Sequence, residues 1–116
     1  MGERKKLPPR RPALTSDVVW RRERGAHRFV VTIGFDPETG TAREVFASAT
    51  RGSDMDLAIA DYCVTLSHIL QLGGDPRALL SSLLKVSDPS SGGSGEFHAS
   101  VMGAIVEAVI EVADHG

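Results

Sequence analysis

The sequence is poor in cysteine and aromatic residues and has no long apolar run. Its single cysteine, Cys63, cannot form an internal disulfide or a multi-thiolate metal site. That excludes disulfide scaffolds, zinc ribbons and iron–sulfur proteins. No run approaches the roughly 18 apolar residues that span a bilayer, and the N-terminus has no apolar signal-peptide core. We therefore expect a soluble, cytoplasmic protein that has no membrane partner.

The spacings that mark common catalytic and metal sites are also missing. The four histidines include no i, i+4 pair of the kind that binds zinc on a helix. The glycines of residues 92–95 lack the Gly-Lys-Ser/Thr of a phosphate loop, and there is no Gly-x-Ser-x-Gly elbow. Cys63 falls in an apolar stripe and should be buried, and His68 should be an interior or interface histidine. We expect no metal, no cofactor and no catalytic residue, which disfavours a small enzyme.

What the sequence does have is the composition of one small globular domain. Its 116 residues are 41% hydrophobic and 24% charged. A chain of this length buries roughly two-thirds of its unfolded surface, enough for one core. Residues 1–13 are basic and rich in proline, which predicts an extended arm. We assign residues 14–115 to a single domain.

Charge is divided unevenly along the chain. Residues 1–28 carry nine basic and three acidic side chains, a net of +6, whereas the remaining residues carry four and twelve, a net of −8. A basic arm can attract nucleic acid or an acidic protein, dock on its own domain, or stay solvated. Arg21, Arg22 and Arg24 either form a contact surface with Trp20 or lie on a solvated strand face. The candidate partner- or phosphate-binding residues are Lys5, Lys6, Arg10, Arg11, Arg21, Arg22 and Arg28.

Three segments before residue 50 have the period of β-strands. They are residues 15–24, residues 27–35, which alternate apolar and polar side chains, and residues 43–48. Gly25-Ala26 is the predicted first turn, and residues 36–40 form a tight loop between the second and third strands. Connections this short predict an antiparallel meander.

After the strands the apolar period changes to that of helices. Ser53 is the predicted N-cap of a helix that ends at Gly73-Gly74. Asp75 caps a second helix that begins at Pro76 and should bury its leucines, which are Leu79, Leu80, Leu83 and Leu84. A polar loop at residues 87–95 leads to a last helix over about 97–113.

The last helix is apolar over so wide an arc that it must be either central or shared with a partner. A homodimer through the C-terminal helices, and hence a homo-oligomer, is therefore expected. The predicted fold class is α+β, with a three-stranded antiparallel meander followed by three helices packed on one sheet face.

Several short stretches, taken in order, resemble a known family. The first is Leu7-Pro8-Pro9-Arg10-Arg11, and Gly25-Ala26-His27-Arg28-Phe29 follows it. Then come Gly40 before Glu44-Val45-Phe46, Gly52-Ser53, and a helix end that reads Leu70-Gln71-Leu72-Gly73-Gly74-Asp75. Over residues 5–85 the chain resembles the TSCPD domain. That domain occurs near the C-terminal end of adenosylcobalamin-dependent ribonucleotide reductases and in small stand-alone proteins of bacteria and phages.

The resemblance implies a binding module, with protein or nucleotide phosphate as its ligand, and not a reductase. Ala26 replaces the second glycine of the family's Gly-Gly turn, and Gly74-Asp75 stands where the family has Val-Pro. The radical barrel, cobalamin site and nucleotide sites of a reductase would need several hundred further residues. We therefore expect a non-catalytic accessory module whose partner is a ribonucleotide reductase or another protein. The alternative is a nucleic-acid-binding protein that uses its basic arm.

Overall fold

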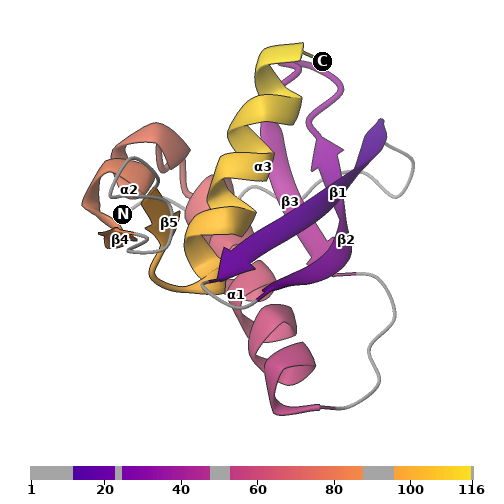
Figure 1. Ribbon diagram of the computed structural model, residues 1–116. Helices are drawn as coiled ribbons and strands as arrows, with labels where there is room; N and C mark the ends of the chain where they lie inside the picture. The colour runs from indigo at the N-terminus through magenta and orange to yellow at the C-terminus, as the bar shows by residue number, and fades with distance from the viewer. Residues whose placement is uncertain (1–11, 23–24, 48–52, 88–95, 116) are drawn as a thin grey trace.

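The first half of the chain, where apolar residues alternate, forms a sheet, and the second half, where apolar residues recur at helical spacing, forms the helices. The computed structural model describes residues 12–22, 25–47, 53–87 and 96–115. The strands are β1 (Ala13–Arg22), β2 (Gly25–Phe35), β3 (Ala42–Ala47), β4 (Lys85–Ser87) and β5 (Glu96–His98). The helices are α1 (Asp54–Gln71), α2 (Pro76–Ser82) and α3 (Val101–His115). The helices lie to one side of the three-stranded sheet, so the predicted α+β class is confirmed (Figure 1).

The sheet is an antiparallel meander in the order β1-β2-β3. Its helix-facing side carries buried Val18, Val31, Ile33 and Val45, because alternate residues of a strand point to one face. Ile33 lies opposite Val45 in the register of β2 and β3. The loop after β2 is closed by the predicted Asp36, whose backbone N–H donates to the Thr41 carbonyl at 2.9 Å.

The predicted first turn at Gly25-Ala26 is wrong. Both residues belong to β2, where Gly25 lies opposite Arg22 and Ala26 lies opposite Arg21. Gly25 has φ +98, a left-handed conformation that side chains rarely adopt. The strand pairing therefore continues further toward the hairpin end than the composition suggested.

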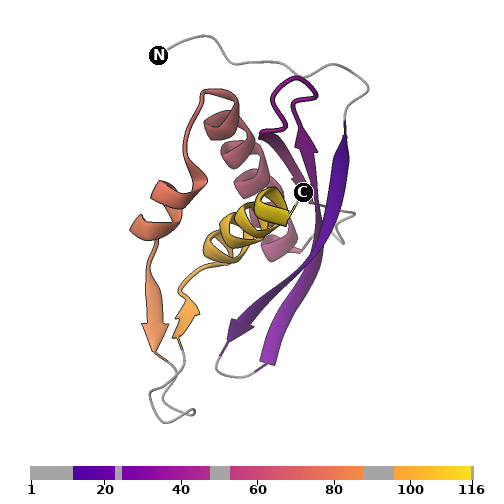
Figure 2. The same ribbon diagram turned by 90° about the horizontal axis from the view of Figure 1, so that it is seen from above.

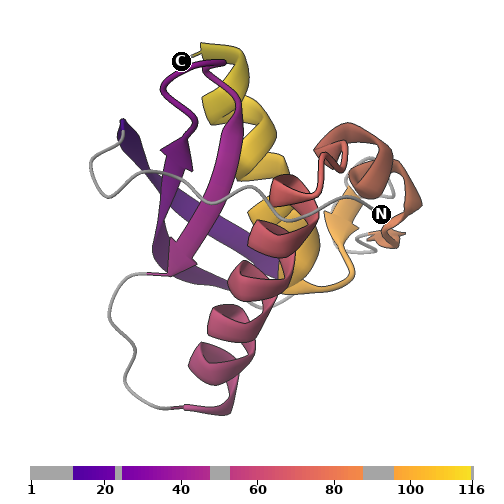
Figure 3. The same cartoon turned by 180° about the vertical axis from the view of Figure 1, so that it is seen from behind.

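Helix α1 covers the β3 side of the sheet, and it begins and ends at the predicted cap and glycine. The Ser53 hydroxyl accepts from the Asp56 backbone N–H at 3.1 Å, and Gly73 follows the helix with φ +89. Ile59, Cys63 and Leu66 are buried. The N-terminal turns of α1 extend beyond the sheet (Figure 3).

Helix α2 does not bury its leucines as predicted. Asp75 caps it by accepting from the Arg77 backbone N–H at 2.9 Å, but no residue of the helix is buried. Three of the four leucines are half-buried, and Leu84 is 77% exposed. The reason is that α2 packs mainly against α3 and not against the sheet. The spacing of apolar residues thus identifies which face of a helix packs against the protein, but it does not determine how deeply that face is buried.

Helix α3 lies beside α1 against the same face of the sheet, and α2 packs on the side of α3 that faces away from the sheet (Figure 2). Val101, Ile105, Val106 and Val109 are almost inaccessible to solvent. Burial within one chain thus accounts for the wide apolar arc, and the expected homo-oligomer stays a prediction. The helix begins at Val101 and not near residue 97, because residues 96–98 pair with residues 85–87 in a second, two-stranded sheet. This β4–β5 ribbon was not predicted from the sequence.

Cys63 is buried as expected. His68 lies on the exposed side of α1, so it is not an interior histidine, and the alternative that it lies in an interface stays a prediction. None of the helices in the described part of the chain is long and apolar enough to cross a lipid bilayer.

Candidate functional site

A cleft lies at the free edge of β1, between the β1–β2 hairpin and the β4–β5 ribbon. It consists of two adjoining cavities of about 220 Å³ and 460 Å³, which share Arg21 and Phe97 as lining residues. The hairpin and the ribbon lie at the same end of the molecule (Figure 2). We call the whole hollow the hairpin–ribbon cleft, the larger cavity its hairpin end and the smaller its ribbon end.

The hairpin end is cationic. Arg21 lies opposite Ala26 and Arg28 lies opposite Val19, so the two arginines are diagonal neighbours on one face of the sheet. Diagonal Cα atoms on adjacent strands are about 7–8 Å apart, within reach of long side chains. Both arginines are exposed, and both line the same cavity together with Gly25, Ala26 and Phe97. Two guanidinium groups in this arrangement can both donate hydrogen bonds to one anionic group.

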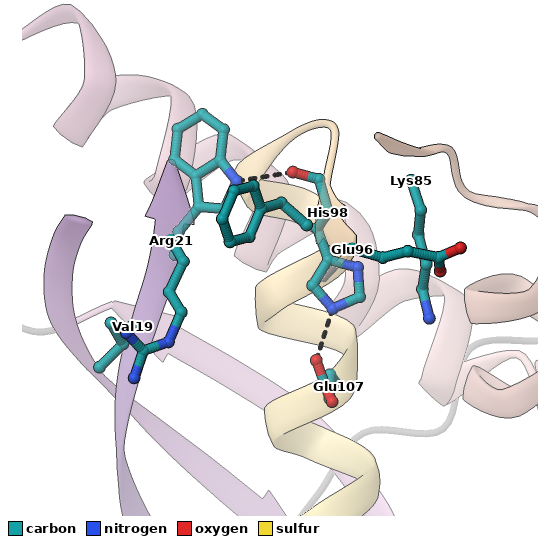
Figure 4. A pocket seen from close by; sticks show the side chains of 8 residues that line it. Val19, Arg21, Lys85, Glu96, His98 and Glu107 are labelled. Carbon is teal, nitrogen blue, oxygen red and sulfur yellow. Dashed lines mark hydrogen bonds and ion pairs between the residues drawn. The ribbon is translucent and has the colours of Figure 1, made fainter. Parts of the chain in front are cut away.

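The ribbon end carries charges of both signs. In Figure 4, Val19 and Arg21 project from the β1 side, Lys85 and Glu96 lie on the far side, and His98 and Glu107 stand between them. Lys85, Glu96 and Glu107 are exposed. Carboxylates accept hydrogen bonds and do not donate them, so this end suits a ligand group that carries N–H or O–H donors.

His98 is the most enclosed titratable residue of the cleft, and its contacts are structural. Its Nε2 atom lies 2.5 Å from Glu107 Oε2, and its backbone carbonyl accepts from Trp20 Nε1 at 2.9 Å. The Nδ1 atom is buried and has no hydrogen-bond partner among the described residues. A Cβ added to Gly103 would meet that atom at 2.6 Å, so the ring lies against the first turn of α3. In this arrangement one ring nitrogen of His98 is engaged by Glu107 and the other is enclosed by α3.

Cys63 offers no accessible thiol, because it lies in the core. Burial raises the pKa of the Cys63 thiol to about 11, which keeps it protonated and unreactive at neutral pH. The described residues contain no group of three or more His, Cys, Asp or Glu side chains that could hold a metal ion. The arrangement is suited to binding through charge and hydrogen bonds.

The predicted binding residues are only partly brought together. Arg21 and Arg28 meet at the hairpin end of the cleft. Arg22 ends β1, but its side chain lies outside the described residues, as does the whole of Arg24. The arm residues also lie outside the described part of the chain; they are Lys5, Lys6, Arg10 and Arg11.

Of the two interpretations offered for the arginines near Trp20, Arg21 follows the solvated strand face, because its side chain is exposed. Trp20 is only 7% exposed and points under the helices, because alternation along β1 turns it away from Arg21. Sequence reasoning also missed Phe97, Glu96 and Glu107, which line the cleft. The first two belong to the unpredicted ribbon, and Glu107 had no distinguishing signal among the polar residues of a helix.

Comparison with known proteins adds one finding. A sequence model described as the TSCPD domain matches residues 4–113, nearly the whole chain and more than the 5–85 over which the motifs were recognised. The searches of curated proteins and of solved structures found no match.

Proposed function

Because the chain belongs to the TSCPD domain family, we propose that it is a non-catalytic binding module, accessory to a ribonucleotide reductase. In this proposal it acts by holding an anionic group of its ligand or partner at the hairpin end of the hairpin–ribbon cleft. The link to a reductase comes from where the family's domains occur, and the site comes from the geometry of this chain.

One observation carries the binding site. Arg21 and Arg28, from neighbouring strands, line one cavity whose floor includes Gly25 and Ala26. The guanidinium fork matches the oxygens of phosphate and carboxylate, and two forks from adjacent strands fix an anion without needing it to be buried. Gly25 and Ala26 also line the cavity, and their small size leaves it open to a ligand.

Two further observations favour binding over chemistry. Both ring nitrogens of His98 are occupied or enclosed by Glu107 and Gly103, and the thiol of Cys63 lies in the core. General acid–base and nucleophilic mechanisms need a group within hydrogen-bond reach of the substrate. The exposed arginines need no such group to act on an anion.

The anion site is tested by titrating the protein with pyrophosphate and following amide chemical shifts by NMR. We expect saturable binding that Arg28→Ala weakens at least tenfold. Arg77→Ala is the matched control, because Arg77 is also an exposed arginine but pairs with Asp114 away from the cleft. Equal effects of the two substitutions would show that only net charge matters and would refute the site.

The accessory role is tested by native mass spectrometry of the chain mixed with an adenosylcobalamin-dependent reductase from the same host. We expect a defined complex that Arg21→Ala or Arg28→Ala weakens and Arg77→Ala leaves intact. The same spectra report the number of copies of this chain and so test the expected homo-oligomer. A mixture of the intact protein and enzyme that shows no complex contradicts the accessory role.

Nucleic-acid binding is the second candidate, because Arg21 and Arg28 add exposed positive charge on the sheet to the basic residues of the arm. In that case affinity for a DNA or RNA oligonucleotide would fall steeply between about 50 and 200 mM salt. A gel shift that shows no complex at about 50 mM salt excludes this candidate. It would leave the anion site untouched.

A further inference from the structure

The two ends of the hairpin–ribbon cleft differ in charge, and this difference constrains the ligand. The hairpin end presents Arg21 and Arg28 with no carboxylate among its lining residues. The ribbon end adds two carboxylates, Glu96 and Glu107, which balance the charges of Lys85 and the shared Arg21. A ligand that fills both ends therefore needs an anionic group at one end and hydrogen-bond donors at the other.

The carboxylates at the ribbon end can still accept hydrogen bonds. Glu107 contacts His98 through Oε2, and its side chain is 49% exposed, so Oε1 can face a ligand. Glu96 is exposed on β5 beside it. With Lys85 and the two arginines, the cleft still has one more positive than negative charge, which favours a ligand of net negative charge.

An aromatic side chain joins the two ends. Phe97 lines both cavities and is half-buried, so its ring is held in place while part of it faces the cleft. A planar ring can stack on such a side chain, and stacking on an aromatic residue is insensitive to which ring is bound.

From this order of groups we infer that the cleft binds a phosphate ester of an amino-substituted aromatic ring, the chemistry of an aminopurine nucleotide. The phosphate lies between Arg21 and Arg28, the ring packs on Phe97, and the amino group donates to Glu107 or Glu96. The inference rests on the proposed anion site. It adds the orientation of the ligand in the cleft and the contact of the ligand's ring with Phe97.

Three ligands that differ by one part each test the inference by calorimetry or NMR titration. Ribose 5-phosphate carries the anion alone, purine riboside 5′-monophosphate adds the ring, and AMP adds the 6-amino group. We expect affinity to rise about tenfold at each step, the size of one stacking contact and of one hydrogen bond to a charged group.

Variants assign each step to its residue. Glu96→Gln/Glu107→Gln should reduce the ratio of the affinity for AMP to that for purine riboside 5′-monophosphate, because a neutral amide oxygen accepts a weaker hydrogen bond than a carboxylate does. Glu111→Gln is the control, because Glu111 is an exposed carboxylate one turn further along α3 and does not line the cleft. Arg28→Ala should weaken all three ligands by the same factor. Glu96→Gln alone keeps the Glu107–His98 contact and so guards against an effect of unfolding.

The outcomes separate this inference from the proposed function. If all three ligands bind equally and depend on Arg28, the anion site stands and the inferred ring and amino contacts are refuted. If AMP exceeds purine riboside 5′-monophosphate equally in the wild type and in the double glutamate variant, the assigned orientation is wrong. If none of the three binds and pyrophosphate does not bind either, both the inference and the anion site fail.

Discussion

Replacing Ser67 with alanine tests how the fold completes the edge of its sheet. β3 is an edge strand, so a backbone N–H on its outer side has no strand partner. At Val45 the hydroxyl of Ser67 takes that place, accepting from the Val45 N–H at 2.8 Å. Val45 is 1% exposed and Ser67 is 7% exposed, so water cannot substitute for the lost oxygen. Ser67→Ala leaves a buried donor without a partner.

The expected cost follows from that donor. An unsatisfied buried N–H costs about 1–3 kcal/mol, and for a domain of this size each kcal/mol lowers the melting temperature by about 4 °C. We therefore expect Ser67→Ala to lower the melting temperature by about 4–12 °C. The measurement is urea unfolding followed by the fluorescence of Trp20, which gives the free energy of unfolding and the m-value together.

Thr65→Ala is the matched control for Ser67→Ala. Both hydroxyls donate to a carbonyl four residues earlier in α1, at 2.8 Å in each case. Thr65 is exposed, however, and its hydroxyl bond to Asp61 stays within the helix. The difference between the two variants isolates the bond to β3. If Ser67→Ala and Thr65→Ala have equal stability within about 0.5 kcal/mol, the role assigned to Ser67 is wrong.

Two further predictions concern Cys63 and Gly103. Because burial raises the pKa of the Cys63 thiol from 9.0 to about 11, the folded chain keeps a proton that the unfolded chain loses. Stability should be unaffected below pH 9 and fall between pH 9 and about 11, and Cys63→Ala should remove that fall in pH-dependent melting curves. Gly→Ala inside a helix normally stabilises it by about 1 kcal/mol. A Cβ at Gly103 would lie 2.6 Å from His98 Nδ1, so Gly103→Ala should lower the melting temperature, and a rise would contradict the packing assigned to His98.

The elements that sequence reasoning predicted are those with several periods of alternation or a cap. Residues 27–35 alternate over enough positions to fix which side chains face the core, and the caps Ser53 and Asp75 accept the backbone bonds expected of them. The misplaced turn at Gly25-Ala26 did not affect the face assignment. Each strand's own apolar pattern decides its buried side, whatever residue closes the hairpin.

What could not be predicted depends on contacts between distant segments. A strand of three residues such as Glu96–His98 shows too little alternation to distinguish it from the first turn of a helix. It pairs with Lys85–Ser87 in the other strand of the ribbon, and no local pattern announces that pairing. The cleft could therefore not be predicted from the sequence, although Arg21 and Arg28 were identified as candidate binding residues from their charge alone.

The position of the ribbon, and with it the shape of the cleft, depends on a short chain of contacts through His98. Trp20 holds the His98 carbonyl from β1, and Glu107 holds its ring from α3. Because Phe97 and Glu96 directly precede His98 in β5, fixing that one residue also fixes the two cleft residues before it. The contacts of His98 therefore give it a structural role in the cleft. Its contacts with β1 and α3 hold the ribbon where Phe97 and Glu96 line the cleft.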